Sequence, residues 1–160
     1  MRTFVDTSAL IALLYPDDSH NKKASTLLGK AYDEGSIYIN TVVYSELAAD
    51  PFFDSRSYLD TFLEDTRISV KKMEKDTLFK AGEYFQMYLQ DRGEELQCPS
   101  CGERTIFKCP RCERKIQSRQ HIPSDFLIGS CAEKFDRLVT FDKGFFREFF
   151  DIEEINTIQS

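Results

Sequence analysis

Short apolar runs alternate along the chain with longer segments whose apolar residues recur at helical spacing. The runs occupy residues 3–5, 37–39, 68–70 and 138–141, and residues 152–158 supply a fifth. The helical patterns cover residues 9–14, 21–33, 44–48, 74–91 and 123–135. Strands that alternate with helices favour a parallel sheet, so the predicted fold class is α/β.

The segment at residues 74–91 is the longest predicted helix, and its amphipathic pattern sets Leu78, Phe85 and Leu89 on one stripe. Gly93 ends this pattern, and the composition then changes. Residues 98–121 carry six Lys and Arg side chains against two acids, a formal charge of +4, whereas the whole chain carries −6. We therefore expect one discontinuous domain at residues 1–93 and 122–160, interrupted by an insertion at residues 94–121.

The composition is typical of a folded domain outside membranes. The chain has 160 residues, the size of about one domain, and its 14 Phe and 7 Tyr supply apolar volume for a core. No apolar run approaches the ~18 residues of a membrane-spanning helix. The first residues reach Asp6 without a long apolar stretch, which argues against a signal peptide. These features predict a cytoplasmic protein with no membrane partner.

Acidic residues recur where predicted strands give way to helices. Asp6 and Asp142 directly follow two strands. Glu46 lies on the helix after a third strand, and Asp125 lies in the first turn of another helix. The carboxyl ends of parallel strands converge on one crevice, where clustered carboxylates repel one another unless a cation lies among them. Hard oxygen ligands suit Mg²⁺ or Mn²⁺, and such an ion activates water and neutralises a leaving oxygen.

The same placement also has a purely structural explanation. With 27 acids in 160 residues, some fall near strand ends by chance. Acids in the first turn of a helix are in any case favoured by the helix dipole. Placement alone therefore leaves open both a catalytic metal site and a set of ordinary acids.

Four strings resemble, in order and spacing, the motifs of PIN-domain ribonucleases, particularly the VapC type of toxin–antitoxin systems. They are residues 4–10 (FVDTSAL), 40–47 (NTVVYSEL), 123–129 (PSDFLIG) and 138–143 (LVTFDK). Each string is weak by itself. The four in sequence cover nearly the whole chain outside roughly residues 94–121.

The resemblance implies a three-layer α/β/α fold with a parallel sheet and an Mg²⁺- or Mn²⁺-dependent endoribonuclease site. It implies that four acids serve as metal ligands, directly or through water: Asp6, Glu46, Asp125 and Asp142. It gives three hydroxyls the task of holding water or orienting the acids: Thr7, Ser8 and Thr140. The implied reaction is in-line hydrolysis of RNA that leaves a 5′-phosphate and a 3′-hydroxyl. The implied partners are RNA, an antitoxin protein and a second copy in a homodimer.

Four of the five cysteines form two CxxC pairs inside the insertion: Cys98, Cys101, Cys109 and Cys112. Two such knuckles aim four thiolates at one ion and predict a structural Zn²⁺ site of the zinc-ribbon kind. Glu113 follows the second knuckle, where ribbons commonly have glycine. Disulfide or redox use of these cysteines is the alternative. Cys131 lies apart, on the apolar face of a helix, and is predicted to pack as a small hydrophobe.

The insertion keeps several functions open. VapC toxins mostly lack it, so an RNA-maturation nuclease competes with a toxin. Its positive charge suits RNA phosphates, but an ordinary solvated ribbon explains it too, since four thiolates on one zinc lower the charge to about +2. A non-catalytic RNA- or protein-binding module that uses the ribbon on a PIN scaffold is the alternative function. A nuclease that acts on DNA or flap structures is a third.

Overall fold

The computed structural model describes residues 1–91, 95–97, 104–116 and 123–157. Its centre is a five-stranded sheet in the order β3-β2-β1-β8-β9. All neighbouring strands run parallel, and the strands are β1 (Arg2–Val5), β2 (Ser36–Asn40), β3 (Ile68–Lys71), β8 (Arg137–Thr140) and β9 (Glu154–Thr157). The predicted α/β class with a parallel sheet is confirmed.

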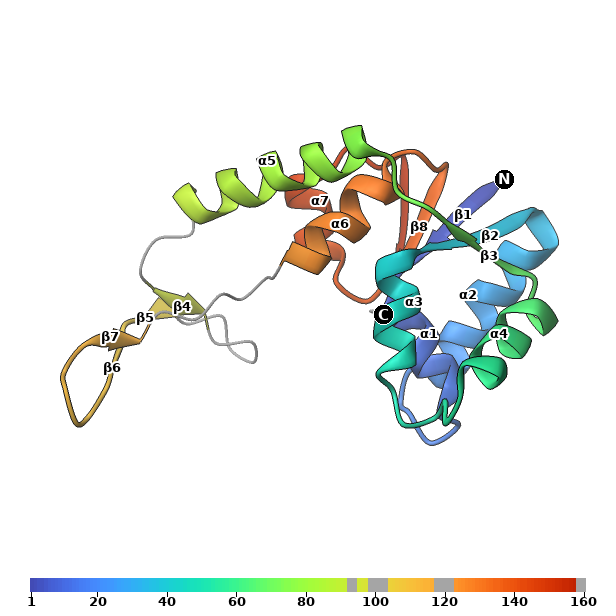
Figure 1. Cartoon of the computed structure of the whole chain (residues 1–160), viewed down its shortest axis with the longest axis horizontal. Helices are drawn as coiled ribbons and strands as arrows, with labels where there is room; N and C mark the ends of the chain where they lie inside the picture. The colour runs from blue at the N-terminus through green and yellow to red at the C-terminus, as the bar shows by residue number, and fades with distance from the viewer. Residues whose placement is uncertain (92–94, 98–103, 117–122, 158–160) are drawn as a thin grey trace.

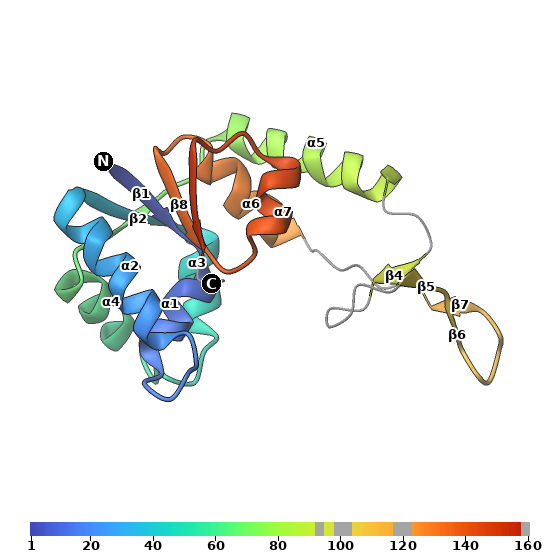
Figure 2. The same ribbon diagram turned by 180° about the vertical axis from the view of Figure 1, so that it is seen from behind.

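Helices cover both faces of this sheet. The helices are α1 (Thr7–Leu14), α2 (Asn21–Glu34), α3 (Thr41–Ala48), α4 (Arg56–Asp65), α5 (Lys75–Asp91), α6 (Pro123–Ala132) and α7 (Lys143–Phe149). Figure 1 shows α5, α6 and α7 on one side of the sheet and α1, α2 and α4 on the other, and Figure 2 shows the same layers from behind. Among the described residues, none of the helices combines the length and apolarity needed to cross a membrane.

An aromatic cluster joins α5, α6 and α7. Phe126 on α6 is 1% exposed, and its ring centroid lies 5.1–6.0 Å from five other rings. These rings belong to Phe85, Tyr88, Phe145, Phe149 and Phe150. A Cβ at Gly129 would lie 2.3 Å from the ring of Phe150, so the glycine allows the chain after α7 to close against α6.

Two helices differ in detail from the sequence prediction. On α5, Leu78 and Leu89 are exposed, and the buried positions are instead Thr77, Ala81 and Tyr88. The predicted helix at residues 123–135 ends at Ala132, because Phe135 turns back and packs its ring on Phe4 and Tyr38, at 5.3 and 5.1 Å.

Short antiparallel strands lie within the insertion. β4 (Leu96–Gln97) pairs with β5 (Arg104–Thr105), and β6 (Phe107–Lys108) pairs with β7 (Lys115–Ile116). In Figure 1 the β6–β7 hairpin projects away from the five-stranded sheet, beyond the end of α5 and the start of α6. The division of the chain into residues 1–93 with 122–160 and an insertion at 94–121 stays a prediction.

Candidate active site

Asp6 lies where the strand order reverses. β1 pairs with β2 on one side and with β8 on the other, and parallel sheets bind ligands at such a point beside the carboxyl ends of the strands. Asp6 directly follows β1, and its backbone N–H donates to the carbonyl of Val139 at 3.0 Å. Its side chain is buried, and Oδ2 accepts hydrogen bonds from Ser8 Oγ (2.6 Å) and Thr140 Oγ1 (2.8 Å).

Glu46 reaches the same place from α3. The Oγ1 of Thr7, the residue after Asp6, donates a hydrogen bond to Glu46 Oε2. Thr7 is buried and Glu46 is half-buried, so this contact holds the second carboxylate against the start of α1. Thr7 therefore connects the first two predicted acids.

Asp142 is connected to Asp6 through Thr140. The Thr140 hydroxyl donates a hydrogen bond to the Asp6 carboxylate. The Thr140 Oγ1 atom in turn accepts a hydrogen bond from the backbone N–H of Asp142 at 3.1 Å. Asp142 is exposed and caps α7, where Oδ1 accepts from the backbone N–H of Phe145 at 3.2 Å. Each of the predicted hydroxyls thus contacts one of the predicted acids or its backbone.

Asn40 is a positioning residue that the sequence prediction did not include. Its side chain is completely buried at the end of β2, and Oδ1 caps α3 by accepting from the N–H groups of Val42 and Val43, both at 3.0 Å. Its Nδ2 donates to the carbonyl of Leu127 at 3.2 Å. Half-buried Asp125 precedes Leu127 by two residues on α6, so Asn40 fixes the turn that carries the fourth acid. An asparagine between an apolar run and a helix is the signal that marks it.

The donor set fits a hard divalent cation. Asp6, Glu46 and Asp142 offer oxygen ligands only, the kind that Mg²⁺ and Mn²⁺ select. No three His, Cys, Asp or Glu side chains within the described ranges lie close enough to hold one ion as they stand. Mg²⁺ normally keeps several waters and uses one or two carboxylates, so ligation partly through water suits this spacing. The roles of the four acids as metal ligands stay predictions.

Burial controls the electrostatics of the site. It raises the pKa of the Asp6 carboxyl, and the negative charge of Glu46 raises it further. Hydrogen bonds from Ser8, Thr140 and the backbone of Thr7 act in the opposite direction. An ionised Asp6 is therefore costly in the absence of a cation, and a bound divalent ion would relieve that cost.

This pKa shift predicts a stabilising substitution in the metal-free protein. Because the folded-state pKa lies above the unfolded-state value, ionised Asp6 destabilises the fold at neutral pH, and the penalty vanishes as the pH falls below the unfolded-state value. We expect Asp6→Asn to raise the Tm at neutral pH and to leave it unchanged below about pH 4. Thermal melts in the presence of a chelator measure both. A Tm that is lowered equally at every pH would contradict the shift.

The second cysteine pair lies in the turn between β6 and β7. The N–H of Cys109 donates to the carbonyl of Arg114, and the N–H of Glu113 donates to the carbonyl of Cys109, both at 2.8 Å. Glu113 has a φ of 57°, the left-handed conformation for which zinc ribbons use glycine. The backbone N–H of Arg111 lowers the pKa of the Cys109 thiol, as do the N–H and thiol of Cys112. A lowered pKa favours the thiolate, the form that binds metal.

The remaining cysteines fall into two groups. Cys98 and Cys101 lie outside the described residues. Cys131 is 5% exposed, and burial raises the pKa of its thiol to about 11. The prediction that Cys131 packs as a small hydrophobe is confirmed.

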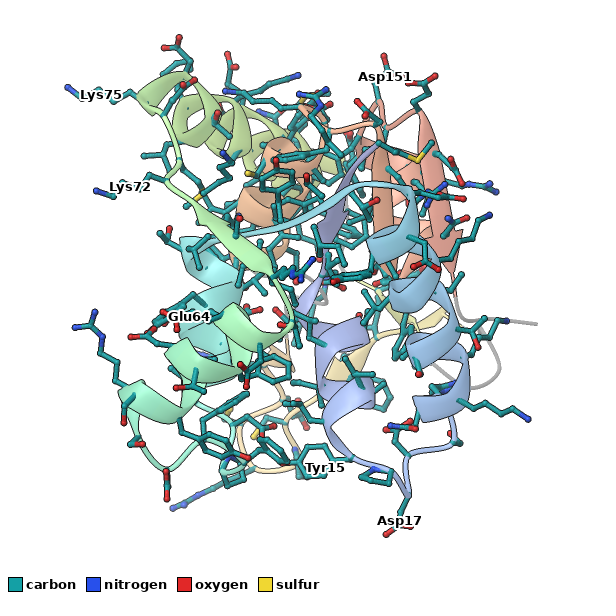
Figure 3. The ribbon with its side chains drawn as sticks, turned by 90° about the vertical axis from the view of Figure 1, so that its right-hand side faces the viewer. Tyr15, Asp17, Glu64, Lys72, Lys75 and Asp151 are labelled. Carbon is teal, nitrogen blue, oxygen red and sulfur yellow. The ribbon has the colours of Figure 1, made fainter. Side chains whose placement is uncertain are left out.

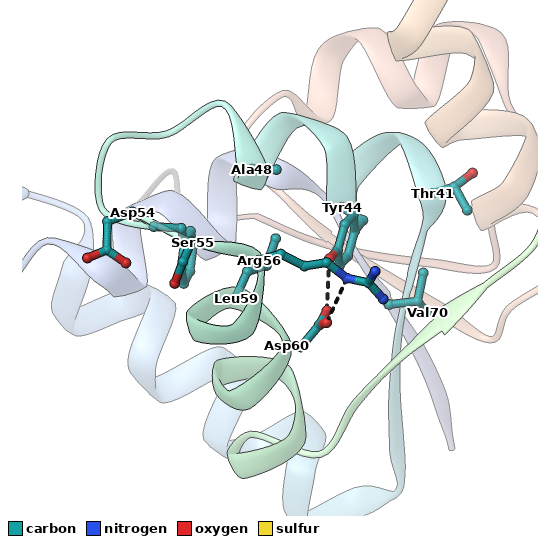
Figure 4. Close-up of a pocket in the computed structure, with 10 residues that line it drawn as sticks. Thr41, Tyr44, Ala48, Asp54, Ser55, Arg56, Leu59, Asp60 and Val70 are labelled. Atoms are coloured by element: carbon teal, nitrogen blue, oxygen red, sulfur yellow. Dashed lines mark hydrogen bonds and ion pairs between the residues drawn. The ribbon is translucent and has the colours of Figure 1, made fainter.

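A cavity of about 720 Å³ lies between α3 and α4, and none of the four acids predicted to bind metal lines it. Figure 4 shows Tyr44, Arg56 and Asp60 in its wall. Asp60 accepts from Tyr44 Oη at 2.8 Å and from Arg56 Nε at 3.1 Å. Tyr44 and Glu46 are two residues apart on α3 and therefore face different sides of the helix. The cavity and the acidic site therefore both use residues of α3 but share none of the predicted metal ligands.

Comparisons with solved structures agree with this architecture. The chain is similar to VapBC2 from Rickettsia felis bound to a DNA fragment from their promoter, with 19% identity, a TM-score of 0.59, and coverage of 96% of this chain and 98% of that one. It is similar to DNA-bound VapBC from Salmonella typhimurium, with 13% identity, a TM-score of 0.59 and 99% coverage of both chains. Mycobacterium tuberculosis VapC20, a sarcin-ricin loop cleaving toxin, gives 18% identity and a TM-score of 0.57 over 94% of this chain and 97% of that one.

At these identities the similarities establish the fold alone. None of the curated proteins matches the sequence. The family model of the PIN domain matches residues 3–91, more than half of the chain. The matched part holds Asp6 and Glu46, whereas Asp125 and Asp142 lie beyond it and rest on the motifs and the sheet topology. The chain belongs to the PIN-domain family.

Proposed function

We propose that this PIN-domain protein is a metal-dependent endoribonuclease that hydrolyses RNA phosphodiester bonds. The observation that carries the proposal is the buried Asp6 carboxylate at the reversal point of the sheet, connected through Thr7 to Glu46 and through Thr140 to Asp142. Family membership supports a nuclease, because PIN domains are typically ribonucleases.

Each residue has a role in this proposal. The four acids hold one or two Mg²⁺ or Mn²⁺ ions, directly or through water: Asp6, Glu46, Asp125 and Asp142. A bound ion would lower the pKa of water and neutralise charge on the leaving oxygen. Ser8 and Thr140 fix the Asp6 carboxylate and Thr7 fixes that of Glu46 by the hydrogen bonds described above. Asn40 acts as a positioning residue for the helix of Asp125.

The proposal is tested by the metal requirement and the products. Protein purified without chelators is incubated with RNA and increasing Mg²⁺ or Mn²⁺. We expect cleavage to depend on the added ion and to leave 5′-phosphate and 3′-hydroxyl ends. Tight RNA binding without cleavage under any divalent ion would favour the alternative, a non-catalytic binding module on a PIN scaffold.

The likeness to VapBC complexes supports a partner as well as a fold. We propose that an antitoxin protein binds this chain in the cytoplasm and that the chain forms a homodimer. A role in RNA maturation is the competing proposal, because most VapC toxins lack the cysteine insertion. The same active site would serve either role. RNA and an antitoxin are the proposed macromolecular partners.

We also propose that the insertion is a zinc ribbon with one structural Zn²⁺. The turn geometry at Cys109 and the positive φ of Glu113 support this, as does the lowered pKa of the Cys109 thiol. The other two proposed ligands are Cys98 and Cys101. A site closed by four thiolates leaves no open position for a substrate, so zinc here would be structural rather than catalytic.

Removal of a thiolate tests the zinc proposal. Cys109→Ser, or Cys98→Ser, is expected to lower the zinc content from about one ion per chain to near zero, because three ligands hold zinc weakly. Elemental analysis of the purified protein gives the content. Since the acids lie in the other part of the chain, RNA cleavage per folded molecule is expected to persist on a minimal substrate. Complete unfolding on loss of zinc would contradict this independence.

A further inference from the structure

The segment formed by β5 and the β6–β7 hairpin carries a charge opposite to that of the rest of the protein. Residues 104–116 contain five basic residues and one acid, a formal charge of +4. Because the whole chain carries −6, the other residues together carry −10. Four thiolates bound to one zinc ion would remove about two positive charges and leave the insertion positive. The hairpin is therefore the basic part of an acidic protein.

The strand register concentrates this charge. Lys108 on β6 stands directly opposite Lys115 on β7. Arg111 and Arg114 lie in the turn between the same two strands, and both are exposed. A bound polyanion would neutralise the positive charge that these residues concentrate at the end of the hairpin.

Apolar side chains are exposed beside these cations. Phe107 is 52% exposed and Ile106 is 42% exposed, because a two-stranded hairpin has no core in which to bury them. Phe107 and Lys108 are consecutive on β6 and point to opposite faces of the hairpin, while Arg111 and Arg114 lie in the turn at its end. Single-stranded nucleic acid binds to narrow elements that offer both groups, since bases stack on the ring and phosphates contact the cations. The phenyl ring distinguishes this surface from a merely basic one.

The hairpin lies near the active site along the chain. Ile116 ends β7, and nine residues later comes Asp125, so the two are separated by at most about 30 Å even with a fully extended chain. Figures 1 and 2 show the hairpin beyond the start of α6, the helix whose first turn carries Asp125. A strand of RNA that reaches the acids can therefore also reach the hairpin.

We propose that the β6–β7 hairpin is a second binding surface for single-stranded RNA, in which Phe107 stacks on a base and Lys108, Arg111 and Arg114 contact phosphates. This inference rests on the proposed nuclease function and adds a substrate-length requirement to it. An acidic protein partner is the competing occupant. The exposed phenyl ring favours RNA, because bases stack on such a ring whereas an acidic protein surface needs only the cations.

The experiment compares charge removal on the hairpin with charge removal elsewhere. The hairpin variant is Lys108→Gln/Arg111→Gln/Arg114→Gln. The matched control is Lys22→Gln/Lys72→Gln/Lys75→Gln, which removes the same charge from exposed positions. Figure 3 shows Lys72 and Lys75 projecting from the body, and in Figure 1 the start of α5 is its end farther from the hairpin. Zinc content and circular dichroism establish that each variant is folded.

Two measurements are made. RNA binding is measured over a salt series in an Asp6→Asn background, and cleavage is measured with a long RNA and with a dinucleotide, whose single phosphodiester bond occupies only the acidic site. We expect the hairpin variant to bind long RNA at least about tenfold more weakly and to lower the salt slope by about 2. Phe107→Ala is expected to weaken binding roughly tenfold with the slope unchanged. Dinucleotide cleavage is expected to stay at the wild-type rate in both the hairpin variant and Phe107→Ala.

The possible failures are distinguishable. If the wild-type protein cleaves RNA and the hairpin variant matches the Lys22/Lys72/Lys75 control on long RNA, this inference is wrong while the nuclease proposal stands. Unchanged RNA binding together with loss of an acidic protein partner would assign the hairpin to that partner instead. If the wild type cleaves neither substrate, the nuclease proposal itself fails.

Discussion

Replacing Asp6 with asparagine is expected to lower RNA cleavage by on the order of 10³-fold or more, while the protein remains folded. Asparagine keeps an oxygen that accepts from Ser8 and Thr140, so the local packing is preserved. It removes the buried negative charge at the reversal point of the sheet. The rate constant with saturating Mg²⁺ measures the loss, and thermal melting establishes that the fold is intact.

A matched variant separates a specific effect from a general one. Asp17 lies in the loop after α1 and projects into solvent, as Figure 3 shows. Asp17→Asn removes the same charge and is expected to change cleavage by less than about twofold. Equal activity of the Asp6 and Asp17 variants would remove Asp6 from the site, and full activity of Asp6→Asn and Asp125→Asn together would overturn the acid assignment.

Phe126→Ala is expected to cost about 3–5 kcal/mol of unfolding free energy, a large part of the ~5–15 kcal/mol that stabilises a typical domain. The Phe126 side chain is 1% exposed and lies among rings from α5, α6 and the α7 region, so truncation leaves a cavity where three elements meet. Urea denaturation measures the loss as a lower midpoint with little change in slope.

Phe79 supplies the control for this prediction. It lies on α5, as do Phe85 and Tyr88 of the cluster, but its side chain is 72% exposed. Phe79→Ala is expected to change stability by no more than about 0.5 kcal/mol. A loss for Phe126→Ala that is no larger than that for Phe79→Ala would show that the aromatic cluster does not stabilise the fold.

The centre of the sheet was predictable because strands β1, β2 and β8 are buried on both faces. Residues such as Val5, Ile39 and Leu138 lie in short apolar runs, and each run ends at a polar residue that starts the next helix. The position of Asp6 follows from the same change, from a buried strand to a capped helix. Local pattern thus predicted where the acids stand along the chain.

Two features that the hydrophobic pattern did not predict, helix α4 and the buried face of α5, depend on tertiary contacts. α4 was not predicted, although Ser55 caps it and Leu59 and Leu63 form its buried face, because the aromatic residues before it obscure its start. On α5, the side chains of Ala81 and Tyr88 are buried, whereas those of Leu78 and Leu89 are exposed. Hydrophobic periodicity alone does not determine which of two adjacent apolar stripes of a helix is buried.

The hydrogen bonds that link the residues of the site could not be predicted from sequence patterns either. The Thr7 hydroxyl meets Glu46 across 39 residues, and the Asn40 amide meets Leu127 across 87. Such pairings depend on how α1, α3 and α6 converge at one end of the sheet. The sequence motifs placed the acids on the right elements, but their hydrogen-bond partners required the assembled fold.

The most direct test of the nuclease proposal is cleavage of mixed tRNA and rRNA with Mg²⁺ or Mn²⁺, run with the wild-type protein beside Asp125→Asn. No chelator is added, because it would remove both the proposed structural zinc and the catalytic ion. We expect discrete fragments with the wild type alone, and their ends would identify the preferred sequence. Absence of cleavage by the wild type, with both proteins binding RNA equally, would contradict the nuclease and leave a binding module on a PIN scaffold.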